Sequence, residues 1–229
     1  MPEILRHTIP ATTVGAYLVG GPHEPGPAPM LVGFHGYGEN AEACMAELRR
    51  IPGSSAFLLV AIQALHRFYD RKHDQVVGSW MTKLDREHAI ADNESYVASV
   101  LAALAREAAG DSRLVYVGFS QGTSMAYRAA ARGARPALGI IALGGDVPPD
   151  VGDDATVTLP PVLIGRGRRD DWYTEEKLAA DLDRLRARGA EVEVARFDGG
   201  HEWTDEFRKV AAAFLRRVLT STGSASPRA

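Results

Sequence analysis

The sequence predicts an α/β protein in which helices cover both faces of a mostly parallel β-sheet. The first observation is that short apolar runs alternate with longer helical patterns, as in parallel sheets. The second is that the intervening segments carry apolar residues at helical spacing. The third is a length of 229 residues with 45% hydrophobic side chains, which suits one large domain, expected over residues 1–220.

Each apolar run is expected to be a strand. The runs span residues 14–19, 30–34, 56–62, 114–118, 138–143, 161–164 and 192–197. Three of the segments between or after them show an apolar stripe that predicts a helix packed on the core. These stripes are Tyr96, Val97, Val100, Leu101 and Leu104, then Leu178, Leu182 and Leu185, and finally Trp203, Phe207, Val210, Phe214, Leu215 and Val218.

Composition excludes several classes of function. The chain has 26 basic and 29 acidic side chains, a net charge of -3, and no basic cluster, so nucleic acid is not an expected partner. It lacks both a leader pattern at residues 1–6 and a run of eighteen apolar residues, which predicts a cytoplasmic protein without stable membrane insertion. A single cysteine, Cys44, excludes an internal disulfide and is expected to be a small core residue.

Three connections complete the predicted organisation. The turn-rich segment 20–27 is expected to be a surface hairpin loop between the first strands, and the polar tail 221–229 is expected to be disordered. The connection between residues 143 and 161 is too short for a helical cap domain, so no large cap is expected. The long segment 62–92 has no clear sheet assignment, and its residues Phe68, Tyr69, Trp80 and Met81 are predicted to wall a pocket.

The most informative motif is Gly118-Phe119-Ser120-Gln121-Gly122. It follows a predicted strand and precedes a helical pattern. A Gly-x-Ser-x-Gly at such a junction is typical of the nucleophile elbow of α/β hydrolases, because the glycines allow the sharp turn that exposes the serine. Ser120 is therefore a candidate nucleophile.

A serine hydroxyl needs a base, usually a histidine oriented by a carboxylate. In α/β hydrolases the acid and then the histidine follow the serine along the chain. Of seven histidines, only His201 lies after Ser120, directly beyond the run 192–197. For the acid, spacing leaves Asp170 and Asp171 open, with Asp170 slightly favoured.

The chemistry also needs backbone N–H groups directed at the oxyanion that develops in acyl transfer. One is expected from Gln121, the residue after the nucleophile. The second is expected in His35-Gly36-Tyr37-Gly38, which follows the run 30–34. The flanking glycines favour Tyr37 as this second donor.

The chain resembles the phospholipase/carboxylesterase family of α/β hydrolases, which includes bacterial carboxylesterases and acyl-protein thioesterases. The resemblance covers residues 30–219 and rests on His35-Gly36-Tyr37-Gly38, the Gly-Phe-Ser-Gln-Gly elbow, Leu143-Gly144-Gly145 and Trp80. It implies an α/β-hydrolase fold and ester hydrolysis.

The acid motif departs from the family's His-Gly-x-x-Asp and reads Arg166-Gly167-Arg168-Arg169-Asp170. The register of this motif selects Asp170 over Asp171. We hypothesise that Arg166, Arg168 and Arg169 also favour an anionic group on the substrate, against the alternative that they lie on a solvated loop.

These residues predict a serine hydrolase that cleaves small-molecule carboxylic esters, with thioesters or lysophospholipid-type esters as further substrates. No metal or organic cofactor is required by this chemistry. The alternatives are an amidase or peptidase, and a hydrolase-fold protein that binds a ligand without catalysis. The sequence leaves monomer and homodimer open.

Overall fold

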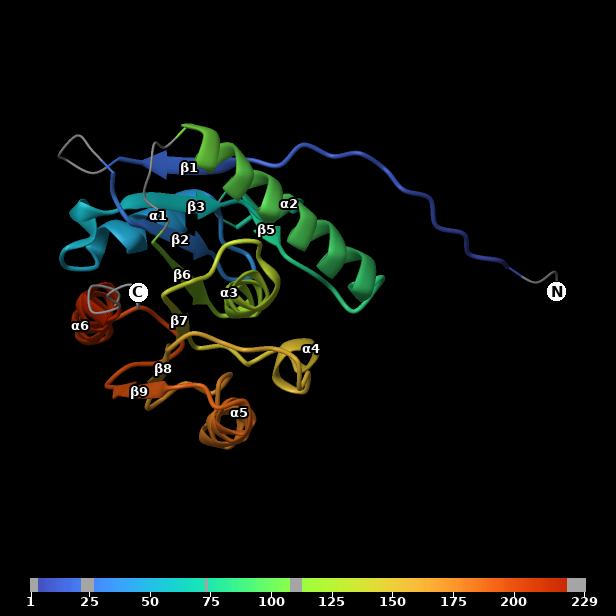
Figure 1. Ribbon diagram of the computed structural model, residues 1–229. Helices are drawn as coiled ribbons and strands as arrows, with labels where there is room; N and C mark the ends of the chain where they lie inside the picture. The colour runs from blue at the N-terminus through green and yellow to red at the C-terminus, as the bar shows by residue number, and fades with distance from the viewer. Residues whose placement is uncertain (1–3, 22–26, 73, 108–112, 222–229) are drawn as a thin grey trace, which may run out of the picture.

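A seven-stranded sheet forms the centre of the molecule (Figure 1). The computed structural model describes residues 4–21, 27–72, 74–107 and 113–221. The strand order is β1-β3-β2-β6-β7-β8-β9; β1 is antiparallel to β3 and all the other neighbours are parallel. The strands are β1 (Tyr17–Gly20), β2 (Met30–Phe34), β3 (Leu58–Ile62), β6 (Leu114–Phe119), β7 (Gly139–Leu143), β8 (Val162–Gly167) and β9 (Val192–Phe197).

Helices cover both faces of this sheet (Figure 1). Helices α1 (Ala41–Arg50) and α6 (Asp205–Ser221) share one apolar cluster with one face. Helices α2 (Arg86–Glu107), α3 (Gln121–Arg132) and α5 (Glu175–Ala187) share a second cluster with the other face, beside the short α4 (Pro149–Gly152). The predicted fold class is confirmed, and the three predicted stripes lie in these two clusters.

Several element bounds differ from those predicted. Helix α2 begins at Arg86 rather than near residue 92. Its first turn is charged, so the apolar period starts only at Ala89, and the pattern could not reveal the true start. Strand β8 continues to Gly167, and its added residues are buried although Arg166 is charged.

The sequence analysis missed an antiparallel hairpin, β4 (His66–Asp70) paired with β5 (Gln75–Ser79). Strand β4 is mostly exposed and carries charged side chains, so it lacks the apolar character that marks the other strands. A 3₁₀ turn, Ser54–Ala56, was missed as well. Between them, the hairpin and the first turn of α2 account for most of the segment 62–92.

Two connections also differ from those predicted. Segment 20–27 does not join a hairpin, because β1 pairs with β3 instead of β2. Residues 22–26 lie outside the described residues. In the predicted tail, Ser221 is the last residue of α6, and 222–229 also lie outside the described residues.

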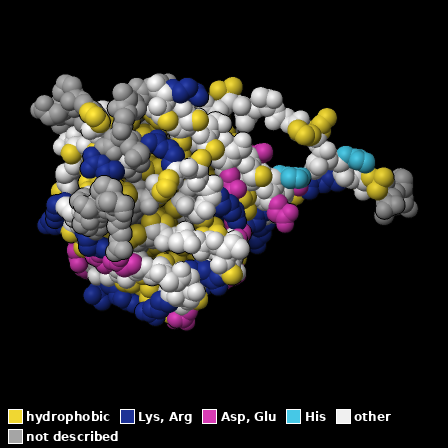
Figure 2. Space-filling view, in the orientation of Figure 1, with side chains coloured by type: hydrophobic (Ala, Val, Ile, Leu, Met, Phe, Trp, Pro, Cys, Tyr) yellow, Lys and Arg dark blue, Asp and Glu magenta, His cyan; other side chains and the backbone are white. Residues whose placement is uncertain are grey.

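The surface shows mixed charge. On the face seen in Figure 2, Lys and Arg side chains are interspersed with Asp and Glu. In the described part of the chain, no helix is long and apolar enough to span a bilayer.

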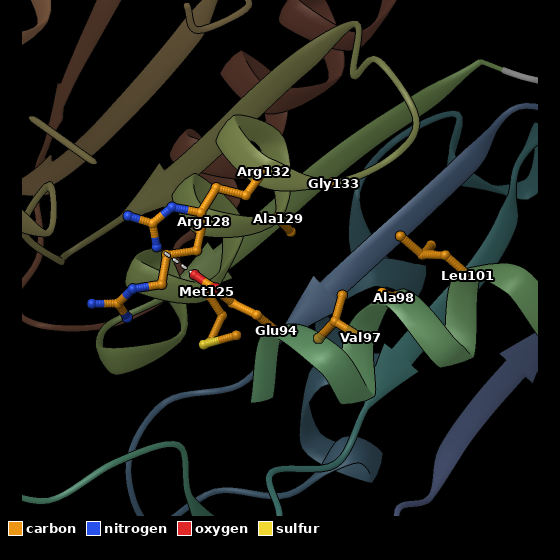
Figure 3. Close-up of a pocket in the computed structure, with 9 residues that line it drawn as sticks. All are labelled: Glu94, Val97, Ala98, Leu101, Met125, Arg128, Ala129, Arg132 and Gly133. Atoms are coloured by element: carbon orange, nitrogen blue, oxygen red, sulfur yellow. Dashed lines mark hydrogen bonds and ion pairs between the residues drawn. The ribbon is translucent and has the colours of Figure 1, made fainter. Parts of the chain in front are cut away.

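An ionic network joins helices α2, α3 and α4. Arg128 of α3 is fully buried, and its Nε and Nη2 donate to the Asp150 carboxylate at 2.9 and 2.7 Å. One turn further along α3, Arg132 binds both Asp150 of α4 and Glu94 of α2. Beside them lies a small cavity of about 80 Å³ between α2 and α3 (Figure 3). A buried cation depends on such partners to offset its lost hydration.

We expect Arg128→Ala to lower the free energy of unfolding by about 3–5 kcal/mol, because it breaks a buried ion pair and leaves a void. The matched control is Arg132→Ala, whose side chain is 35% exposed, and it should cost about 1 kcal/mol or less. Urea unfolding of both variants measures the difference. Equal losses would contradict a special role for the buried arginine.

Candidate active site

Ser120 lies in a strained turn between β6 and α3. Its backbone has φ 52° and ψ -121°, a conformation that L-residues rarely adopt. The turn brings α3 against the end of β2, where a Cβ at Gly122 would lie 2.1 Å from the Phe34 carbonyl oxygen. A Cβ at Gly118 would lie 2.5 Å from the Cα of Thr123. Both glycines of the motif are therefore required by close backbone contacts.

Three side chains from different loops form one hydrogen-bonded chain. Ser120 Oγ donates to His201 Nε2 at 2.8 Å, and His201 Nδ1 donates to Asp170 Oδ2 at 2.8 Å. Asp170 follows β8 and His201 follows β9, so the parallel order brings both to the edge of the sheet where β6 ends. This is the arrangement in which an imidazole can take the serine proton.

The surroundings of Asp170 distinguish it from Asp171. The Asp170 side chain is buried, and its Oδ1 accepts hydrogen bonds from the backbone N–H groups of Trp172 and Tyr173 at 2.9 and 2.8 Å. Asp171 is exposed. The structure therefore places Asp170 beside His201, with one carboxylate oxygen held by the backbone and the other free to orient the imidazole.

Gly144 gives His201 the space it occupies. This residue follows β7 with φ +64°, and a Cβ there would lie 3.1 Å from two atoms of the His201 ring and 3.4 Å from Asp170 Oδ2. A side chain at this position would push against the histidine and its carboxylate partner.

Two backbone N–H groups near Ser120 are candidates to bind an oxyanion. Gln121 is the first residue of α3, so its N–H has no acceptor within the helix. In the preceding loop, Gly36 N–H donates to Glu39 Oε2 and Gly38 N–H donates to the Gly78 carbonyl. Within the described residues, the N–H of Tyr37 between them has no acceptor. This loop approaches the serine closely, since a Cβ at Gly36 would lie 3.3 Å from Ser120 Cβ.

Glu39 was not anticipated from the sequence. Its carboxylate holds Gly36 N–H at 2.8 Å, and burial raises its pKa above the ordinary value. The only sequence signal was its place directly after the glycine loop. The structure shows that this residue fixes the loop from inside.

His35 anchors the other end of the loop. Its Nδ1–H donates to the Gly36 carbonyl at 2.7 Å, while Nε2 accepts from Ala64 N–H at 3.0 Å. This pair of bonds requires the neutral imidazole, and burial lowers the pKa of His35 below its ordinary value of 6.5. His35 is thus a structural histidine.

The side chain of Gln121 holds a neighbouring segment in place. Its Oε1 accepts from Trp80 N–H at 2.8 Å, and its Nε2 donates to the Met81 carbonyl at 2.8 Å. Trp80 in turn donates its indole N–H to the His35 carbonyl at 2.8 Å. The motif predicts a role for the backbone of Gln121 but not for this side chain.

A cavity of about 530 Å³ opens beside Ser120. Its lining residues are Tyr37, Met81, Arg86, Ser120, Gln121, Ser124, Asp146, Trp172 and His201. Of the four predicted wall residues, Met81 lines this cavity. Trp80 is fully buried behind the wall, Phe68 contacts the Tyr37 ring at 5.6 Å between centroids, and Tyr69 is exposed on the hairpin. None of these three lines the cavity, because Phe68 and Tyr69 belong to the hairpin strand β4 and Trp80 is enclosed in the core.

The arginines near Asp170 also lie differently from the hypothesis. Arg166 is buried, donates to the Tyr173 carbonyl at 2.8 Å and pairs with Glu175. Arg169 pairs with Asp198, and Arg168 is exposed. None of the three lines the cavity.

Four lining residues were not predicted from the sequence: Arg86, Ser124, Asp146 and Trp172. Trp172 lies 5.4 Å from His201 between ring centroids, and Arg86 stands at the start of α2. Neither Trp172 nor Arg86 belongs to a recognisable motif.

Within the described ranges, no group of three metal-ligating side chains is placed to hold an ion.

Comparison with known proteins identifies the family. A family model described as Phospholipase/Carboxylesterase matches residues 23–219. The chain belongs to this family. The family is one of carboxylic ester hydrolases, so its new member is an enzyme of the esterase and thioesterase type. No curated protein matches the chain significantly.

Solved structures share the fold of this family member. Esterase PE8 is 24% identical with a TM-score of 0.72, over 89% of this chain and 99% of that one. The carboxylesterase of Bacillus cereus is 15% identical with a TM-score of 0.71, over 89% and 94% of the two chains. Acyl-protein thioesterase 2 of Zea mays is 18% identical with a TM-score of 0.68, over 90% and 100%.

The buried neutral His35 predicts a loss of stability in mild acid. Because its folded-state pKa lies below 6.5, the unfolded chain binds more protons as the pH falls through 6.5, and the free energy of unfolding decreases. His35→Gln keeps an acceptor for Ala64 but cannot titrate. Between about pH 7.5 and about pH 5.5, urea unfolding should show a smaller loss for the variant than for the wild type. The same pH dependence in both proteins would contradict the assignment.

A substitution at Gly144 should lower activity by more than its loss of stability accounts for. Gly144→Ala and Gly189→Ala each place an alanine at a positive φ, +64° and +66°, and each should cost about 1–2 kcal/mol of stability. Only at Gly144 would the new methyl group meet His201. We expect Gly144→Ala to lower kcat for an aryl ester by about 10-fold or more, with Gly189→Ala at the wild-type rate. Equal rates in both would show that His201 tolerates the displacement.

Proposed function

We propose that this enzyme hydrolyses carboxylic esters through an acyl-enzyme on Ser120. His201 removes the proton from Ser120 Oγ as the oxygen attacks the acyl carbonyl, and the carbonyl electron pair moves onto its oxygen. The N–H groups of Tyr37 and Gln121 stabilise this oxyanion. The tetrahedral intermediate collapses, and His201 gives the proton to the departing alcohol.

Water completes the reaction. His201 takes a proton from a water molecule, which attacks the acyl-enzyme carbonyl and forms a second tetrahedral intermediate at the same N–H groups. Collapse of that intermediate breaks the bond to Ser120 Oγ, which regains the proton from His201. Asp170 orients the imidazole and stabilises its charged form in both halves of the reaction.

The observation that carries this proposal is the hydrogen-bonded chain from Ser120 Oγ through His201 to Asp170, with both bonds at 2.8 Å. The strained backbone of Ser120 supports it, because such strain is typical of a nucleophile elbow. The N–H of Tyr37, which has no acceptor among the described residues, supports the oxyanion site.

The cavity favours small ester substrates. Its volume of about 530 Å³ is within the range of small-molecule sites, and it combines Met81, Tyr37 and Trp172 with a few polar groups. A thioester would form the same acyl-enzyme, which agrees with acyl-protein thioesterase 2 of Zea mays among the structural neighbours. The single cysteine and the dispersed charge fit a cytoplasmic location.

The decisive experiment is labelling with a fluorophosphonate, which phosphonylates an activated serine. We expect one adduct per chain, located on Ser120 by peptide mass spectrometry, and none in Ser120→Ala. Hydrolysis of an aryl ester should fall by about 10⁴-fold or more in Ser120→Ala and His201→Gln, and by a comparable factor in Asp170→Asn.

Ser124→Ala is a matched control, since Ser124 lines the same cavity outside the hydrogen-bonded chain. It should still form the adduct on Ser120. A folded wild-type protein without an adduct, and with the same rate as Ser120→Ala, would favour a non-catalytic binding protein. Faster cleavage of an anilide than of the matched ester would favour an amidase.

A further inference from the structure

Arg86 is a cation in the wall of the Ser120 cavity. It is the first residue of α2 and follows the segment that Gln121 holds at Trp80 and Met81. In the part of the chain that the structure describes, Arg86 makes no ion pair or side-chain hydrogen bond. A guanidinium with five unused donors is suited to bind a carboxylate or phosphate.

The neighbouring acids are already engaged. Asp146 lines the same cavity, but its Oδ2 lies 3.6 Å from Lys177 Nζ. Asp85, next to Arg86 in the chain, pairs with Arg6. Arg86 is therefore a lining cation without an ion pair among the described residues, whereas the Asp146 carboxylate of the same wall is paired with Lys177.

Hydrogen bonds join helix α2, which begins at Arg86, to the segment beside Ser120. Asn93 of α2 donates to the Trp80 carbonyl at 2.7 Å, and Gln121 binds Trp80 N–H from the other side. Helix α2 is thereby joined at Asn93, through Trp80, to Gln121, the residue after Ser120. Such a connection holds a binding group at a defined distance from the reacting atoms.

Apolar side chains complete the wall shared by these two groups. The cavity contains Met81, Tyr37 and Trp172 in addition to Arg86 and Ser120. A substrate that fills it would present an ester to Ser120, an apolar spacer to these side chains and an anionic group to Arg86.

We propose that Arg86 forms an anion subsite, so that the preferred substrates are esters that also carry a carboxylate or other anionic group remote from the scissile carbonyl. This inference rests on the proposed ester hydrolysis and adds the substrate class. Arg86 takes the role that was expected of Arg166, Arg168 and Arg169, none of which lines the cavity. The anionic group can belong to the acyl half or to the alcohol half of the ester.

The test compares anionic and neutral esters of equal size. Mono-4-nitrophenyl adipate and 4-nitrophenyl adipamate place a carboxylate or an amide on the acyl side. The acetyl esters of 4-hydroxybenzoate and 4-hydroxybenzamide do the same on the alcohol side. The measured quantity is the ratio of kcat/KM for the anionic ester to kcat/KM for its neutral partner.

We expect this ratio to fall by about three- to thirty-fold in Arg86→Gln for at least one pair, since a charge-assisted hydrogen bond is lost at an exposed site. A fall in the adipate pair alone assigns the anion to the acyl half, and a fall in the benzoate pair alone assigns it to the alcohol half. The ratio for Arg86→Lys should lie between the values for the wild type and Arg86→Gln, because lysine keeps the charge but not the planar guanidinium.

Arg106→Gln is the matched control. Arg106 is exposed in the last turn of the same helix, about 30 Å from Arg86 along the axis, and its removal should leave both ratios at the wild-type value. An equal ratio in Arg86→Gln and wild type, or an equal fall in Arg106→Gln, would overturn the subsite. If either of these results is obtained while the neutral esters are still cleaved, only this inference fails. If no ester is cleaved and Ser120 forms no fluorophosphonate adduct, the proposed hydrolysis itself fails.

Discussion

The backbone of Ser120 is the constraint on which the rest of the site depends. A residue at φ 52° and ψ -121° needs contacts that hold it there. Its N–H donates to the Leu143 carbonyl of β7 at 2.8 Å, and its carbonyl accepts from Thr123 Oγ1 at 2.8 Å. Gly145 packs so closely that a Cβ there would lie 2.3 Å from the same carbonyl oxygen. Strand β7 and helix α3 together fix the direction of the serine.

Hydrogen bonds extend this rigidity to the surrounding loops. The elbow residue Gln121 binds the segment at Trp80 and Met81, and Trp80 binds the carbonyl of His35. His35 and Glu39 then hold the two sides of Gly36. Ser120, the loop that contains Tyr37 and one wall of the cavity are therefore parts of a single hydrogen-bonded unit. A site built in this way is organised before a substrate arrives.

Much of this arrangement could be predicted from local sequence. Strand runs such as 30–34 and 192–197 are apolar and bounded by turn residues, and the order of Ser120, Asp170 and His201 follows from chain topology. The side-chain partners could not be predicted, because they come from distant segments. Nothing local shows that Arg166 turns to Glu175 or that the Gln121 amide binds Trp80. The hairpin β4–β5 was not predicted because the charged residues of the exposed strand β4 conceal the strand period.

Gln121 serves the site through two different parts of one residue. Its main-chain N–H is the proposed oxyanion donor, while its side chain secures the cavity wall. Every amino acid except proline supplies the same main-chain N–H. Side-chain replacement at position 121 therefore leaves the proposed oxyanion donor in place and alters only the support of the wall. In a library of variants at this position, differences in substrate preference would therefore arise from changes in the wall. To measure the contribution of the N–H group, the main-chain amide would have to be replaced by an ester.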